Sequence, residues 1–228
     1  MPMKRKSWKR KSKPRFPRRR KFGPTITALK AAVVPDRLIV RLPYVNYANL
    51  NGAAGVPLDV QFRLNSIYDP EVSVGVGQSQ PLGADQWSAF YNRYRVIGAN
   101  VYLMARNTNT DAAYVGICAN NDMTALLNEA AYEQSRTQLK MVGSTAGGHD
   151  VCVFKKYYNL ANLSGRPKIA YISDDRYQAQ FDADPQEQIH LHIMAQPASP
   201  SLSVSLHYSL KIMYLVELFD RKSLAQST

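Results

Sequence analysis

Apolar and polar residues alternate with a period of two along much of this chain, which predicts β-strands that bury one face. The alternation is clearest in residues 201–212, where six apolar side chains alternate with four serines, a histidine and a lysine. Residues 188–195 repeat the pattern, with isoleucine, leucine, isoleucine and alanine on one face. Pro197 and Pro200 predict the turn that joins these two strands.

Six further extended segments bring the number of predicted strands to eight, and they lie at residues 37–46, 58–65, 95–106, 113–119, 138–142 and 151–158. The segment 95–106 is less regular, as a strand covered on both faces would be. The glycine-rich residues 143–148 predict a hairpin loop between the fifth and sixth strands. Helical patterns occur only near 85–94 and 124–136. The pattern therefore predicts an all-β fold, a single eight-stranded antiparallel jelly-roll sandwich.

The composition is that of one substantial folded domain. Hydrophobic residues make up 45% of the 228 residues, enough for a packed core. Cys118 and Cys152 are too few for a disulfide scaffold or a cysteine-rich zinc module, and we expect them to be small core residues. No apolar run approaches the roughly 18 residues of a transmembrane helix, and no secretory signal is evident. We therefore expect a soluble, non-secreted protein without membrane insertion.

The positive charge of the chain is concentrated at one end. Residues 1–21 contain 12 of the 29 lysines and arginines and no acidic residue, whereas the rest of the chain has 17 basic and 17 acidic residues. The net charge of +12 thus belongs to a short leader, and the body is neutral by composition. We expect a disordered arm at residues 1–24, a jelly-roll domain at 25–222 and a flexible tail at 223–228.

The leader is predicted to stay unfolded and to bind a polyanion. Its like charges repel, its three prolines interrupt helices, and it has too little apolar bulk to offset the entropy of ordering. Lysine and arginine neutralise phosphates, and Trp8 and Phe16 can stack on unpaired bases, at about 1–3 kcal/mol each. The clusters at 4–6, 9–11 and 18–21 also fit a nuclear import signal. The predicted nucleic-acid-binding residues are Lys4, Arg5, Lys6, Trp8, Lys9, Arg10, Lys11, Lys13, Arg15, Arg18, Arg19, Arg20 and Lys21.

An acidic membrane surface is the alternative partner, but the leader lacks amphipathic periodicity. In the body, His190 and His192 form an H-x-H pair that could ligate a metal. The glutamate that a cupin-like metal site needs is missing after them, so we expect both rings to face solvent or an interface. We expect no metal and no cofactor.

No catalytic constellation is evident, so we expect no enzyme activity. Neither His149 nor His207 has an evident serine or cysteine partner, and Gly75-Val76-Gly77 is not continued as a P-loop. A group of carboxylates lacks the calcium-binding EF-hand spacing and is expected to be a solvated loop. Its members are Asp174, Asp175, Asp182, Asp184 and Glu187.

One central motif resembles a known family. It reads Tyr68-Asp69-Pro70, a glycine-rich spacer, Gln80-Pro81-Leu82-Gly83, Asp85-Gln86-Trp87, Phe90-Tyr91, Tyr94 and Val96. With the basic leader and the strand layout, it is similar to the capsid proteins of circular Rep-encoding single-stranded DNA viruses, relatives of circoviruses. This leader departs from circoviruses proper in having more lysine than arginine at its start.

The resemblance implies single jelly rolls, sixty to a small icosahedral T=1 shell, around a circular single-stranded DNA genome. It implies entry into the nucleus through the basic arm and an import receptor. It also implies that Trp87, Phe90, Tyr91 and Tyr94 form a buried aromatic helix and turn ahead of a strand beginning near Arg95.

We therefore expect a capsid protein, found in the virion and the host nucleus, whose partners are further copies of itself, the DNA genome and the import receptor. The sequence does not identify an attachment receptor. Two alternatives stay open. One is the coat protein of a small RNA virus, because a basic arm and a jelly roll serve RNA equally well. The other is a cellular basic nucleic-acid-binding protein, or a jelly-roll enzyme, that acts as a monomer.

Overall fold

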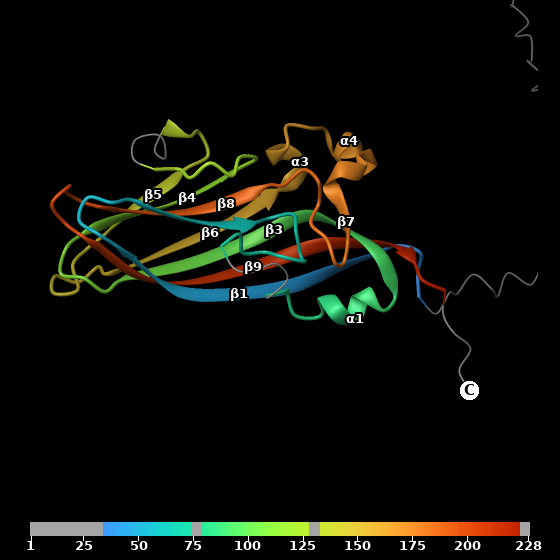
Figure 1. The fold of residues 1–228 in the computed structure, drawn as a ribbon, viewed down its shortest axis with the longest axis horizontal. Helices are drawn as coiled ribbons and strands as arrows, with labels where there is room; N and C mark the ends of the chain where they lie inside the picture. Colours follow the sequence, from blue (N-terminus) through green and yellow to red (C-terminus); the bar gives the residue numbers. More distant parts are fainter. Residues whose placement is uncertain (1–33, 74–78, 128–132, 224–228) are drawn as a thin grey trace, which may run out of the picture. The chain divides into compact units, whose positions relative to one another are not determined.

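Two antiparallel β-sheets pack face to face in the described part of the protein (Figure 1). The computed structural model describes residues 34–73, 79–127 and 133–223, all within the second of the two units, 1–33 and 34–228, into which the chain divides. The first sheet has the strand order β1 (Leu38–Gly52), β9 (Val204–Arg221), β3 (Tyr91–Asn107), β6 (Val151–Asn159), and the short β7 (Gln178–Gln180) pairs near the start of β3. The second has the order β2 (Leu58–Arg63), β8 (His190–Pro197), β4 (Ala113–Asn120), β5 (Gln138–Val142).

This strand order is that of a jelly roll, which confirms the predicted fold class. All pairs within both sheets are antiparallel. If the three-residue β7 is set aside, strands consecutive in sequence lie in opposite sheets, except for β4 and β5. A jelly roll divides eight strands between two sheets by crossing in this way. The additional β7 is a ninth, marginal strand at one end of the first sheet.

Four short helices complete the described elements, and their bounds are α1 (Ala84–Ser88), α3 (Leu160–Leu163), α4 (Lys168–Ser173) and η2 (Asp175–Tyr177). Figure 1 shows α3 and α4 together beyond the end of β6. The Asn159 side chain caps α3 by accepting a hydrogen bond from the backbone N–H of Asn162. The Tyr171 hydroxyl of α4 donates to the Val96 carbonyl oxygen of β3 at 2.8 Å, which ties this group to the first sheet.

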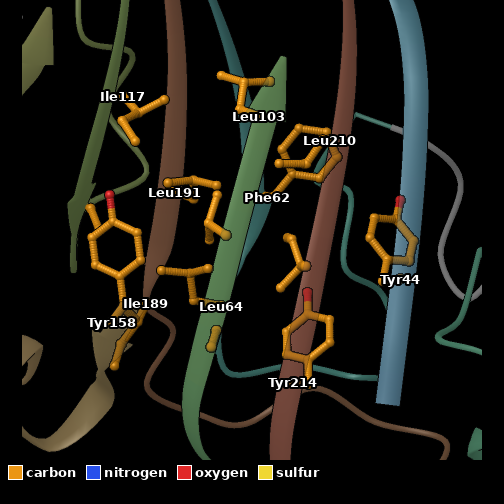
Figure 2. Close-up of a cluster of buried hydrophobic side chains, with 14 of the residues drawn as sticks. Tyr44, Phe62, Leu64, Leu103, Ile117, Tyr158, Ile189, Leu191, Leu210 and Tyr214 are labelled. Carbon is orange, nitrogen blue, oxygen red and sulfur yellow. The ribbon is translucent and has the colours of Figure 1, made fainter. Parts of the chain in front are cut away.

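The core lies between the sheets, where the apolar faces of their strands meet (Figure 2). Phe62 and Ile117 reach it from the second sheet, and Leu103 and Leu210 reach it from the first. The alternation expected along residues 201–212 is confirmed from Val204 onward, because every second side chain of β9 from Val204 to Leu218 is buried. Several tyrosine hydroxyls at the core are hydrogen-bonded, although that of Tyr158 is buried without a partner among the described residues. For example, the Tyr214 hydroxyl donates to the carbonyl oxygen of Arg63 at 2.8 Å, and complete burial raises the pKa of this phenol well above its usual value.

The expectation that segment 95–106 is covered on both faces is wrong for most of its length. The chain alternates regularly from Ala99 to Asn107, with Tyr102 and Met104 exposed on the outer side. The irregular pattern comes from a β-bulge between Val96 and Gly98, where the register against β9 shifts by one residue. Only the part of β3 near the bulge is covered on both sides.

The hairpin predicted at residues 143–148 is also wrong. β5 pairs with β4 in the second sheet, whereas β6 pairs with β3 in the first. Residues 143–148 therefore carry the chain from one sheet to the other. Period-2 patterning shows which side chains of a strand are buried. β5 and β6 bury their apolar side chains in the same core from opposite sides, so the pattern looks the same whether the two strands share a sheet or not.

The aromatic helix and turn are only partly as expected. Tyr91 and Tyr94 are fully buried, but they lie in β3, which begins four residues before the predicted start at Arg95. Trp87 is half-buried in α1, and Phe90 is 39% exposed. The reason is that α1 has only five residues and packs against the sheet on one side alone.

Some expectations fall outside the described residues. These are the disordered arm at 1–24, the tail at 223–228 except for Ser223, and the middle of the helical pattern at 124–136.

Candidate nucleic-acid interface

The predicted nucleic-acid-binding residues, from Lys4 to Lys21, all lie outside the described residues. The described body presents a second surface with related chemistry on the outer side of the first sheet. We call it the cationic sheet face and define it by Arg41, Tyr47, Tyr102, Arg106, Lys155, Tyr157 and Lys211, which are all exposed on β1, β3, β6 and β9.

The strand register fixes the neighbours on this face. Lys211 of β9 lies opposite Tyr102 of β3, and Tyr102 lies opposite Lys155 of β6. Neighbouring strands are about 4.8 Å apart, so the two lysines flank the tyrosine across about 10 Å. The ammonium nitrogen of Lys155 lies 5.2 Å from the centroid of the Tyr102 ring, within the range of a cation–π interaction. The register thus builds a lysine–tyrosine–lysine row from three strands.

Tyr157 lies on the adjacent rung of the same face, opposite Asn100. A Cβ at Gly98 would overlap the Tyr157 ring, so the glycine lets this ring lie against the backbone of β3. Tyr102, Tyr157 and the two lysines line a shallow hollow of about 420 Å³. The rings are accessible, because Tyr102 is 39% exposed, Tyr157 is 50% and Tyr47 of β1 is 74%.

The strands of the first sheet are strongly biased in charge, although the body as a whole is neutral. β1, β3 and β6 contain no acidic residue, and β9 contains only Glu217 and Asp220, both near its end. Glu217 is buried and paired with Arg95 and Arg37. The same four strands carry eight cations, which are Arg41, Arg93, Arg95, Arg106, Lys155, Lys156, Lys211 and Arg221.

Four of these eight cations form no ion pair with a described residue, and three of the four belong to the cationic sheet face; the fourth, Lys156, donates to the Arg136 carbonyl oxygen. Arg106 is paired with Asp150 at 2.9 Å, but Arg41, Lys155 and Lys211 form no ion pair with any described residue. A face with exposed rings, unpaired cations and no carboxylate beside its Lys211–Tyr102–Lys155 row attracts anionic, aromatic ligands. The sequence alone predicts no ligand here. The alternation of residues 201–212 does place Lys211 on the polar side of its strand, and this is the one sequence feature that could have indicated the cationic sheet face.

The outer side of the second sheet is different, and it corrects the expectation for His190 and His192. Both rings are buried rather than facing solvent. They do lie opposite the apolar row, as the alternation predicts. However, the chain after β4, residues 121–126, covers them, and we call these residues the covering segment. Leu126 of this covering segment packs in a small apolar cluster with Cys118 and Met194. Burial of the outer face therefore comes from a loop that the strand pattern does not predict.

His192 joins the covering segment to the sheet. Its Nδ1 lies 2.8 Å from Oδ2 of Asp59, and its Nε2 lies 3.0 Å from Oδ1 of Asn120 and 3.1 Å from the Asp122 carbonyl oxygen. The same Asp59 oxygen accepts from the backbone N–H of Leu126 at 3.0 Å. Both ring nitrogens thus lie within hydrogen-bond distance of oxygen atoms, one from β2 and the others from the end of β4 and the segment after it.

His190 has a different environment. Its Nδ1 has no hydrogen-bond partner among the described residues, and burial lowers its pKa from 6.5 to about 4, with the neighbouring His192 and Arg63 acting in the same direction. His190 is therefore neutral in the folded protein at physiological pH. Within the described ranges, no group of three or more histidine, cysteine or acidic side chains converges as a metal site.

The acidic group predicted to be a solvated loop is partly an ion-pair network. Asp174 pairs with Arg166 at 2.5 Å and with Arg176 at 2.8 Å, and Arg176 also pairs with Glu187 at 2.9 Å. Hydrogen bonds from the side chain and backbone of Arg176 hold the pKa of Asp174 down at about 2. Asp184 is hydrogen-bonded to Ser66. The remaining members, Asp175 and Asp182, are exposed as expected.

The other predictions for the body are simpler. Cys118 and Cys152 are buried free thiols, as expected of small apolar residues, but only Cys152 lies in the core between the sheets, whereas Cys118 packs in the small cluster with Leu126 and Met194. Among the helices of the described residues, none is long and apolar enough to cross a membrane.

Comparison with known proteins gives no family assignment: no family model and no curated protein matches the chain. Among solved structures, the chain is similar to a protein of Desmodium yellow mottle tymovirus, at 13% identity and a TM-score of 0.43 over 86% of this chain and 95% of that one. It is similar to a protein of tobacco necrosis virus, at 11% identity and a TM-score of 0.46 over 83% and 85% of the two chains. It is also similar to a decameric BFDV capsid protein, at 12% identity and a TM-score of 0.42 over 80% and 99%. These scores are low, so the jelly-roll assignment rests on the strand order.

Proposed function

We propose that this chain is a viral capsid protein that assembles into a small icosahedral shell and packages circular single-stranded DNA through its basic leader. The observation that carries the proposal is the separation of charge from fold. A jelly-roll body that is neutral by composition is joined to a leader that contains 12 basic residues and no acidic one. The body supplies lateral contacts between subunits, and the leader neutralises the packaged polymer.

The leader condenses the genome without reading its sequence, because phosphate contacts carry no base information. Sixty copies of a +12 leader supply about 720 positive charges, each able to offset one phosphate. That neutralises only part of a genome long enough to encode this chain and a replication protein, so other cations or the body itself contribute the rest. The choice of DNA is supported by the resemblance of residues 68–98 to capsid proteins of single-stranded DNA viruses.

The basic clusters of the leader also act as a nuclear localisation signal, bound by an import receptor. This places the chain in the virion and, during assembly, in the host nucleus. The same clusters serve nuclear import and genome packaging, because the import receptor and the DNA both bind exposed lysine and arginine side chains. Packaging then releases the import receptor, since the polymer and the receptor compete for one segment.

Electron microscopy and nuclease treatment of the purified full chain test the proposal. We expect rounded, uniform particles of megadalton mass and, after their disruption, nucleic acid that DNase degrades and RNase does not. A lone 25.6 kDa subunit without affinity for polyanions would refute the capsid assignment. Particles that contain RNA would refute the assignment of DNA and leave the capsid assignment intact.

Two leader variants test whether packaging depends on the positive charge of the leader or on the order of its residues. Replacing the 12 basic residues of positions 1–21 by glutamine should abolish nuclear accumulation and nucleic-acid retention while the body stays folded. A matched variant with the same 21 residues in scrambled order keeps the charge and should retain nucleic acid. If the glutamine variant packages as efficiently as the native chain, the leader is not the packaging element.

A further inference from the structure

We propose that the cationic sheet face is a second binding site for single-stranded DNA, formed by the folded body and separate from the leader. The proposal rests on the proposed function, which supplies the polymer, and deepens it by naming where on the body the polymer lies. Its core is the row of Lys211, Tyr102 and Lys155, with Tyr157 on the adjacent rung.

Charge complementarity supports this occupant. Arg41, Lys155 and Lys211 have no carboxylate partner among the described residues, and the central rungs of the face contain no acidic side chain. Unpaired cations on a rigid sheet repel one another and are stabilised by an anion that spans several of them. A polynucleotide has one phosphate per nucleotide and can span them in sequence, whereas a small anion can reach only one or two.

The aromatic rings indicate a single strand rather than a duplex. Tyr102 and Tyr157 lie beside the lysines, and Tyr47 lies farther along on β1. Unpaired bases can stack on exposed rings, whereas the bases of a duplex are already stacked on each other. Alternating cations and rings therefore match the alternating phosphates and bases of a single strand. The rings are held in place, since Lys155 contacts Tyr102 and Tyr157 lies against Gly98.

A second copy of this face is a poor alternative occupant. A two-fold contact of the face with itself would place cations against cations in a buried interface, and like charges brought together in this way are strongly unfavourable. The exposed tyrosines alone would suit a protein partner, but such a partner would need matching carboxylates to accompany them. The polymer supplies both kinds of group at once.

Photocrosslinking of the full chain tests the site. The probe is an oligothymidylate that contains 5-iododeoxyuridine, and mass spectrometry then locates the crosslinked peptides. We expect crosslinks at Tyr102 and Tyr157 in addition to the leader. Crosslinks confined to residues 1–33 would overturn the sheet-face site and leave the proposed function standing. Crosslinks of the two tyrosines to an iodouridine RNA oligonucleotide but not to the DNA would overturn the assignment of DNA.

Salt dependence gives a second, independent readout. The double variant Lys155→Gln/Lys211→Gln should lower the slope of log affinity against log salt by about 1.4, at about 0.7 per lost contact with a single strand. The matched control is Lys168→Gln/Lys222→Gln, which removes the same charge from exposed positions outside the face and should leave the slope unchanged. Equal slopes for the two double variants would overturn the site.

The aromatic component is tested by Tyr102→Leu and Tyr157→Leu, which keep apolar bulk at exposed positions. Each should weaken binding of the oligonucleotide about fivefold or more. Tyr114→Leu, on the second sheet, is the control and should not change affinity. Unchanged affinity in both Tyr102 and Tyr157 variants would overturn the stacking role, and particle formation by all three variants shows that they fold.

Discussion

Acidification should destabilise the body through His190. Burial lowers the pKa of this ring to about 4 in the folded protein, whereas in the unfolded chain it returns to 6.5. Between these values the unfolded state binds one proton more than the folded state, so the contribution of His190 to stability is complete above 6.5 and is lost as the pH falls toward 4. The slope is about 1.4 kcal/mol per pH unit, and the total loss is about 3 kcal/mol.

Urea unfolding at several pH values, at fixed protein concentration, measures this loss. The test compares the native chain with His190→Gln, which cannot take up the proton. Between about pH 6.5 and about pH 5, the native chain should lose about 2 kcal/mol more than the variant. His207→Gln, which changes a partly exposed histidine on the other sheet, should keep the native pH dependence. If His190→Gln has the same pH dependence as the native chain, the neutral buried ring is not what makes the body acid-sensitive.

Three further substitutions test the core and the covering segment. Tyr214→Phe removes the hydroxyl that donates to the carbonyl oxygen of Arg63 in the core. The free energy of unfolding, measured in urea, should fall by about 1–3 kcal/mol. An unchanged free energy of unfolding would contradict that hydrogen bond. Asp59→Ala removes the oxygen that lies beside His192 Nδ1 and accepts from the Leu126 N–H, and it should cost about 1–3 kcal/mol for each buried group left unpaired. It should also expose residues 121–126 to limited proteolysis, whereas native-like resistance would show that Asp59 does not hold this segment. Removal of a fully buried tryptophan side chain costs about 3–5 kcal/mol of unfolding free energy, and Trp87→Ala should cost less because this ring is only half-buried. A loss of about 5 kcal/mol in the unassembled chain would contradict the half-buried position of Trp87.

The strands could be predicted because the burial of each strand is visible in its own sequence, as an alternation of apolar and polar residues. Every second side chain of β9 from Val204 to Leu218 is buried, and the period is visible without knowledge of any neighbour. The pairing of strands could not be predicted in this way. β5 and β6 are close in sequence and lie in different sheets, whereas β1 and β9 are at opposite ends of the body and pair along 15 residues. Period-2 patterning contains no information on the partner strand.

The histidines show the same limit for a candidate site. The sequence places His190 and His192 on the face opposite the apolar row, and that is where they lie. Their burial depends on a segment that packs over the sheet through Leu126 and the Asp59–His192 pair. Such a contact joins residues that are 67 positions apart, so no local pattern can reveal it.

The sequence by itself determined where the charge of this protein lies along the chain: a leader of +12 and a body with equal numbers of acidic and basic residues. Only the tertiary structure decided where the charge of the body lies in space. The jelly roll brings Arg41, Lys155 and Lys211 from three strands onto one face, while several carboxylates are paired in loops at the end of the sheets. The physical reason is that composition sums charges over a chain, whereas an electrostatic field depends on which of them a fold sets side by side.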